Sequence, residues 1–130
     1  MLYINNREYL CFLDYGINFI KGKWKAVIIC HLQHGPLRYG VLYRKMGNVS
    51  QKVFSQSLRD LENAKLINRL VYPSIPPKVE YLLTDKGKLL LASLKTLENW
   101  AKVYIETSGF TCEELNENQY PNAILEDNGI

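Results

Sequence analysis

Hydrophobic residues recur at helical spacing in five segments of the chain, and this pattern predicts five helices. The expected helices span residues 10–20, 24–32, 39–46, 50–63 and 85–105. Glycine residues lie close to the ends of the first three segments, which is typical of helix termination.

Two short segments, residues 67–72 and 78–83, have the pattern of β-strands. The segment between them, Pro73–Pro77, contains three prolines, which cannot pair in a central strand and therefore indicate the tip of a hairpin. A short helix, a turn, a second helix and a hairpin match a winged helix–turn–helix. The predicted fold is mainly α with a small β-hairpin wing, an α+β arrangement.

The fourth predicted helix has two unlike faces. Ser50 is a suitable N-cap, and Phe54, Leu58 and Leu61 form one apolar face. The opposite face is polar and has the side-chain types that hydrogen-bond to base edges and phosphates. A polar face of this kind is also typical of an ordinary solvated helix, but its position after a turn and before a hairpin favours DNA. The candidate DNA-binding residues are Arg38, Ser50, Gln51, Lys52, Ser55, Gln56, Arg59 and Lys78.

The last predicted helix is apolar over most of its circumference, so a domain this small cannot bury it alone. A second copy of the chain is the expected source of the missing surface. The candidate dimer-interface residues are Leu90, Leu94, Leu97, Trp100, Ala101 and Tyr104.

The net charge of +3 hides an uneven distribution of charged residues. Residues 1–105 hold all 16 basic residues and 7 acidic ones, a net charge of +9, whereas residues 106–130 hold 6 acidic residues and no basic one. A basic body favours a polyanionic partner. We therefore divide the chain into an N-terminal arm (1–9), a winged helix–turn–helix domain (10–106) and an acidic C-terminal tail (107–130).

Composition excludes several classes of protein. The 130 residues contain no apolar run long enough for a transmembrane helix, and residues 1–9 do not resemble a secretory signal, so a cytoplasmic location is expected. The three cysteines are expected to be reduced thiols. Cys30 and His34 lack further ligands, so no metal or cofactor is expected. No nucleophile–base pair suggests an enzyme.

Several short motifs, in this order, resemble the HxlR-type winged helix–turn–helix transcriptional regulators, cousins of the MarR group in bacteria. The resemblance covers about residues 11–105. Its motifs are Gly22-Lys23-Trp24, Gly35-Pro36-Leu37-Arg38-Tyr39, Val49-Ser50-Gln51-Lys52, Leu58-Arg59-Asp60-Leu61-Glu62, Val71-Tyr72-Pro73-Ser74-Ile75-Pro76-Pro77-Lys78-Val79-Glu80-Tyr81, Leu83-Thr84-Asp85-Lys86-Gly87 and Trp100-Ala101.

The resemblance implies a dimer formed through the first and last helices, a recognition helix at about Ser50–Asn63 and a wing at about Asn68–Leu83. It also implies that Cys11, 13 residues before Trp24, is a redox-sensor candidate. Here Phe12 follows that cysteine in place of the family's usual proline, and a buried structural cysteine is the alternative interpretation.

A second departure from the family pattern follows the recognition helix, where Lys65 replaces the usual glycine. If Lys65 is left-handed there, the strain costs roughly 1 kcal/mol.

The sequence thus predicts a homodimer that binds double-stranded DNA at a pseudo-palindromic operator and regulates transcription. Two other functions fit the same residues: a winged-helix module that binds a protein partner, and a thiol switch that acts through dimer rearrangement. The residues identify no particular small-molecule or oxidant inducer.

Overall fold

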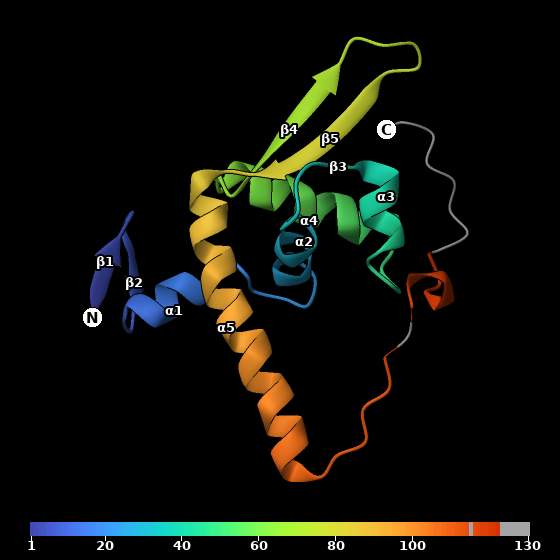
Figure 1. Cartoon of the computed structure of the whole chain (residues 1–130). Helices are drawn as coiled ribbons and strands as arrows, with labels where there is room; N and C mark the ends of the chain where they lie inside the picture. The colour runs from blue at the N-terminus through green and yellow to red at the C-terminus, as the bar shows by residue number, and fades with distance from the viewer. Residues whose placement is uncertain (115, 123–130) are drawn as a thin grey trace.

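A computed structural model describes residues 1–114 and 116–122 of the chain. Three helices and a small sheet form the body of the molecule, and a long C-terminal helix extends away from it (Figure 1). In chain order the elements are β1 (Leu2–Ile4), β2 (Arg7–Tyr9), α1 (Phe12–Ile17), α2 (Lys25–His31), β3 (Leu37–Arg38), α3 (Tyr39–Arg44), α4 (Gln51–Asn63), β4 (Ile67–Tyr72), β5 (Lys78–Leu83), α5 (Asp85–Ser108) and a 3-10 helix (Glu117–Gln119).

The main sheet has three antiparallel strands in the order β3-β5-β4, and β4 and β5 continue beyond it as a hairpin. Ile67 pairs with Leu83 at the base of this hairpin, and Tyr72 pairs with Lys78 close to its tip. Alternate residues of β5 are buried, so one face of the strand covers the core while the other faces solvent. The two predicted strands are confirmed with the expected bounds.

The hydrophobic core lies between α2, α3, α4 and the sheet. Its fully buried side chains include Ile28 and Ile29 from α2, Leu42 from α3, Phe54 from α4 and Ile67 from β4. Each such side chain stabilises the fold by about 1.5–3 kcal/mol through burial of apolar surface. The core therefore fixes the position of α4 against the two preceding helices.

The helices agree with the sequence pattern except at their ends. The first predicted helix, residues 10–20, is shortened to Phe12–Ile17. Beyond Ile17 the backbone bonds change to the tighter i→i−3 pattern, with Asn18 donating to Tyr15 and Phe19 donating to Gly16. The last helix continues to Ser108, and the left-handed Gly109 ends it.

Residues 1–9 form a two-stranded hairpin that the sequence analysis did not anticipate. Asn5 and Asn6 make its two-residue turn with φ values of 51° and 63°. Asparagine tolerates this left-handed conformation better than most residues do. The predicted N-terminal arm is therefore ordered, and it continues directly into α1.

The junction between α4 and β4 depends on two unusual residues. Lys65 is left-handed, with a φ of 63°, which confirms the conformation considered for this position. The Thr84 hydroxyl donates to the Lys65 carbonyl (2.6 Å) and accepts from the Gly87 amide (3.1 Å), so it also caps α5. A side chain at Gly87 would collide with the Leu66 carbonyl, which explains the glycine there.

The described part of the C-terminal tail returns to the helical body (Figure 1). The Asn122 side-chain amide donates to the Tyr43 carbonyl in α3 at 3.3 Å. Residue 115 and residues 123–130 of the predicted tail lie outside the described residues. None of the described helices combines the length and the apolar composition needed to cross a membrane.

Candidate nucleic-acid interface

Helix α4 separates an apolar face from a polar face, as its sequence predicts. Phe54, Leu58 and Leu61 are buried in the core. On the outer side Gln51, Lys52, Gln56 and Arg59 are exposed to solvent. The Ser50 hydroxyl accepts a hydrogen bond from the Val53 amide (3.1 Å), which confirms the predicted N-cap and shows that this hydroxyl serves the helix.

Hydrogen bonds from two tyrosines fix the angle between α3 and α4. The Tyr39 hydroxyl lies 2.9 Å from the Ser55 hydroxyl, and the Tyr43 hydroxyl donates to the Val49 carbonyl at 2.7 Å. Both tyrosine rings pack against Phe54. Ser55, predicted as a base-reading residue, is therefore partly buried and engaged in holding the two helices together.

A chain of polar side chains runs along the outer part of α4. The Arg59 guanidinium donates to the Gln56 carbonyl oxygen (2.9 Å), and the Gln56 amide donates to the Asp60 carboxylate (2.8 Å). Lys25 of α2 pairs with the other Asp60 oxygen at 3.2 Å. The structure thus brings together the predicted reading residues Gln56 and Arg59 and orients both before any ligand binds.

Asp60 is a functional residue that the sequence analysis left outside the polar face. The hydrogen bond from Gln56, aided by the Lys25 ammonium, lowers the pKa of the Asp60 carboxyl. The carboxylate therefore stays charged at neutral pH and keeps the Gln56 amide fixed. The four-residue spacing between Gln56 and Asp60 was the available signal, because residues at this spacing are neighbours on a helix.

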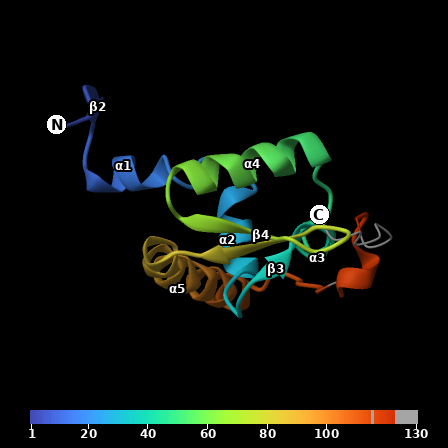
Figure 2. The same ribbon diagram turned by 90° about the horizontal axis from the view of Figure 1, so that it is seen from above.

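The wing projects from the body next to the N-terminal part of α4 (Figures 1 and 2). Lys78 lies at its base, where the ammonium is 4.5 Å from the centre of the Tyr72 ring and 3.9 Å from the Glu80 carboxylate. Ile75 at the tip is fully exposed. Arg38, the other predicted phosphate-binding residue, belongs to β3 and is the register partner of Glu80 in β5.

Exposed apolar side chains cover parts of α1 and α5. On α5, Leu97, Trp100 and Tyr104 are at least half exposed, and the Trp100 and Tyr104 rings stack with centroids 5.2 Å apart. The other predicted interface residues of α5 differ in exposure: Leu94 is buried in the chain's own core, and Leu90 packs against it. The uncovered apolar surface therefore begins beyond Leu94.

The three cysteines have different surroundings, and all of them are free thiols. Cys11 is the N-cap residue of α1 and is exposed, so its neighbours do not bury the thiol within a single chain. Cys30 is partly buried, and this burial raises the pKa of its thiol. Within residues 1–114 and 116–122, no three His, Cys, Asp or Glu side chains are grouped to hold a metal ion.

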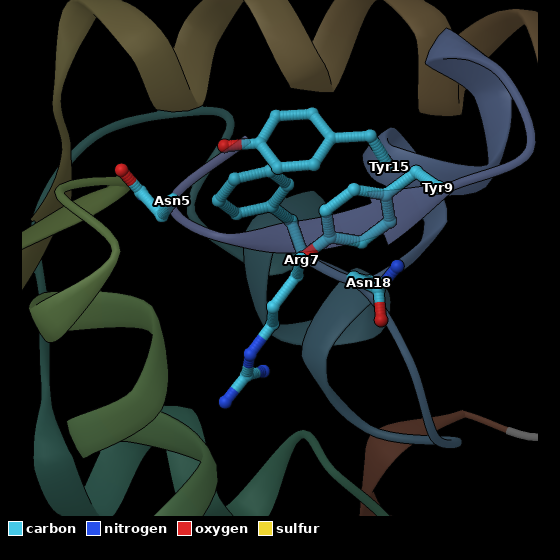
Figure 3. Close-up of a pocket in the computed structure, with 6 residues that line it drawn as sticks. Asn5, Arg7, Tyr9, Tyr15 and Asn18 are labelled. Carbon is cyan, nitrogen blue, oxygen red and sulfur yellow. The ribbon is translucent and has the colours of Figure 1, made fainter. Parts of the chain in front are cut away.

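A second hollow, of about 380 Å³, lies between the N-terminal hairpin and α1. The Tyr9 and Tyr15 rings meet edge to face with centroids 4.9 Å apart, and the Arg7 side chain extends away from them (Figure 3). The ring stack continues to Phe19. This packing anchors the hairpin to α1, and the sequence analysis missed it together with the hairpin.

A three-helix core followed by an antiparallel hairpin, with α4 exposing a polar face beside that hairpin, defines a winged helix–turn–helix protein. The sequence model of the HxlR-like helix-turn-helix family matches residues 19–109. The chain belongs to this family. The predicted resemblance and the predicted fold are therefore both confirmed.

Related proteins are transcriptional regulators. An uncharacterized HTH-type transcriptional regulator of Methanothermobacter thermautotrophicus is 44% identical over 97 residues, which are 75% of this chain and 74% of that protein. The crystal structure of a putative HTH-type regulator, ytcD, aligns with a TM-score of 0.70 at 42% identity and covers 75% of this chain and 99% of that one. The redox regulator HypR in its oxidized form aligns with a TM-score of 0.68 at 31% identity, over 72% of this chain and 96% of its own.

Proposed function

We propose that the chain is a sequence-specific DNA-binding regulator that acts as a homodimer on a pseudo-palindromic operator. The observation that carries this proposal is the exposed polar face of α4, on which Gln56 and Arg59 are held in a hydrogen-bonded row. Arginine favours guanine edges and glutamine favours adenine edges in the major groove. The protein acts by binding and not as an enzyme, and because its partner is DNA we expect it to act in the cytoplasm.

In this arrangement one α4 helix per subunit enters the major groove. Two such helices, related by the dimer axis, contact half-sites about 34 Å apart. Gln51, Lys52, Gln56 and Arg59 face the base edges and the adjoining phosphates, while Ser50 and Ser55 support the helix. The wing tip lies along the DNA backbone or the minor groove, with Lys78 and Arg38 on phosphates.

The DNA affinity of the purified protein tests the proposal. Duplex fragments selected from a random pool should share a pseudo-palindromic motif, and their affinity should fall steeply between about 50 and 200 mM salt. The alternative function, binding to a protein partner through α4 and the wing, predicts no selected motif. An absence of salt-dependent DNA affinity would falsify the DNA-binding proposal.

We further propose that oxidation of Cys11 regulates DNA binding. Three observations support this role: the thiol is exposed, it lies at the start of α1, and a redox regulator shares the fold. Because α1 carries exposed apolar residues next to Cys11, a modified thiol there would change how α1 packs in a dimer. A Cys11→Ser variant should bind DNA like the reduced protein and lose the response to diamide. If this variant still responds to diamide, Cys11 is not the sensor.

A further inference from the structure

A basic hollow of about 420 Å³ lies between α4 and the segment that joins α1 to α2. Five of the residues that line it are cationic, and one is anionic. They are Lys21, Lys23, Lys25, Lys52, Arg59 and Asp60. No other part of the predicted DNA-binding surface has so many cations around one depression, and the sequence analysis assigned no role to residues 21–25.

The hollow carries more positive charge than its own carboxylate can neutralise. Asp60 pairs with Lys25, and the Arg59 guanidinium is bound to Gln56. The Lys23 ammonium lies 4.9 Å from the centre of the Trp24 ring, which leaves its charge uncompensated. Among the described residues, neither Lys21 nor Lys52 forms an ion pair. The hollow is therefore suited to an anionic group from another molecule.

The hollow is continuous with the polar face of α4. Lys52, Gln56 and Arg59 belong to both, because the spacing of these residues places them along one side of the helix. Figure 2 shows α4 as an outer layer of the molecule, with the connection between α1 and α2 beside it and away from the wing tip. The two flanks of α4 therefore carry different elements: the wing on one and residues 21–25 on the other.

The dimensions of DNA determine what would lie on those flanks. A helix with its side chains is about 10–12 Å wide, and the major groove is about 12 Å wide. A helix that fills the groove therefore has a phosphate backbone running along each flank. Charge and position both favour the DNA backbone as the occupant of the hollow over a free phosphorylated molecule.

Building on the proposed function, we propose that Lys21, Lys23 and Lys25 form a phosphate-binding rim that contacts the DNA strand on the flank of α4 away from the wing tip. Lys21 and Lys23 supply mobile charges, and the pair with Asp60 holds Lys25 in place. Contacts of this kind add affinity and fix register without reading sequence. The rim and the wing then hold the two borders of the same groove.

The test compares a Lys21→Ala/Lys23→Ala variant with a charge-matched control, Lys95→Ala/Lys102→Ala, whose lysines lie on α5. Affinities for the selected operator and for an unrelated duplex are measured at several salt concentrations. The rim variant should lose affinity for both duplexes, and its slope of log affinity against log salt should fall by about 2, close to 0.9 per lost phosphate contact. The ratio between the two duplexes should stay unchanged. The control should keep the wild-type slope.

Two outcomes would overturn the proposal while leaving the proposed function in place. One is a wild-type salt slope in the rim variant, with thermal unfolding showing that the variant is folded. The other is binding of inorganic phosphate or ATP that the rim variant loses while its DNA slope is unchanged, which would assign the hollow to a small anion. A wild-type protein without salt-dependent DNA affinity would reject the proposed function itself. A Lys21→Arg/Lys23→Arg variant should restore the slope, because it keeps both charges.

Discussion

The hydroxyl oxygens of Tyr39 in α3 and Ser55 in α4 lie 2.9 Å apart, and their hydrogen bond joins the two helices of the helix–turn–helix unit. The bond is partly buried, next to the edge-to-face contact between the Tyr39 and Phe54 rings. It therefore fixes the direction in which α4 leaves the core. Ser55 contributes to DNA binding through the position of the helix more than through a base contact of its own.

A double-mutant cycle measures this contribution. Tyr39→Phe and Ser55→Ala should each lower the free energy of unfolding by about 1 kcal/mol, because each removes one partner of a net-stabilising hydrogen bond. The double variant should lose clearly less than the sum of the two. Urea unfolding at one protein concentration gives all four values. Additive losses would mean that the two hydroxyls do not interact in solution.

The sequence predicted which faces of the helices are buried, but not how polar side chains are used between helices. Periodicity assigned Ser55 to the outer face of α4 and placed Phe54, Leu58 and Leu61 correctly in the core. It contained no information about Tyr39, because the contact between Tyr39 and Ser55 joins residues 16 positions apart. Tertiary contacts of this kind depend on packing angles that a one-dimensional pattern does not specify.

The same limit explains the other omissions. The β1–β2 hairpin has strands of only three residues, too short for an alternating pattern to be recognised. The rim at residues 21–25 becomes a site only because α4 packs beside it. In contrast, the caps at Ser50 and Thr84 and the bounds of the wing follow from local chemistry, and all were predicted.

Substitutions on α4 and on the wing should separate base reading from phosphate binding. Gln56→Ala or Arg59→Ala should reduce the preference for the selected operator over an unrelated duplex by about 1–3 kcal/mol, roughly 5- to 150-fold. Lys78→Ala should weaken binding to both duplexes equally. Fluorescence anisotropy with the two duplexes measures both effects. Since Gln56 and Arg59 are hydrogen-bonded to each other, their effects should not add. An unchanged preference in both α4 variants would exclude them as reading residues.

The exposed aromatic pair on α5 should be required for dimerisation. Trp100→Ala removes a large apolar side chain that is 60% exposed in the single chain, so it should raise the dimer dissociation constant by at least about 30-fold. Sedimentation over a range of protein concentrations gives this constant. Lys102→Ala on the same helix serves as the control, because its only ion pair, with Glu98, is exposed and contributes little. A Trp100→Ala variant that dimerises like the wild type would exclude this surface.

Cys30 and Cys112 should differ in their reactivity toward an alkylating reagent. Burial is the larger cause that raises the pKa of the Cys30 thiol, and the nearby Glu98 carboxylate adds to it. A raised pKa means less thiolate at a given pH, so Cys30 should react slowly at neutral pH and its rate should keep rising above about pH 8.5. Cys112 is exposed and should react first. Mass spectrometry of labelled peptides at several pH values measures both rates, and faster labelling of Cys30 would contradict the packing around α2.

Lys65 should be a site where glycine stabilises the protein. Its φ of 63° is left-handed, a conformation that costs a residue with a Cβ atom roughly 1 kcal/mol and costs glycine nothing. The Lys65 side chain is exposed and the carbonyl that accepts from Thr84 belongs to the backbone, so a Lys65→Gly variant keeps this contact. Its free energy of unfolding should rise by about 1 kcal/mol. Lys88→Gly, in the ordinary helical turn of α5, is the matched control and should lower it by a similar amount. Both are measured by urea unfolding at equal protein concentration, and equal losses in the two variants would show that residue 65 is not left-handed in solution.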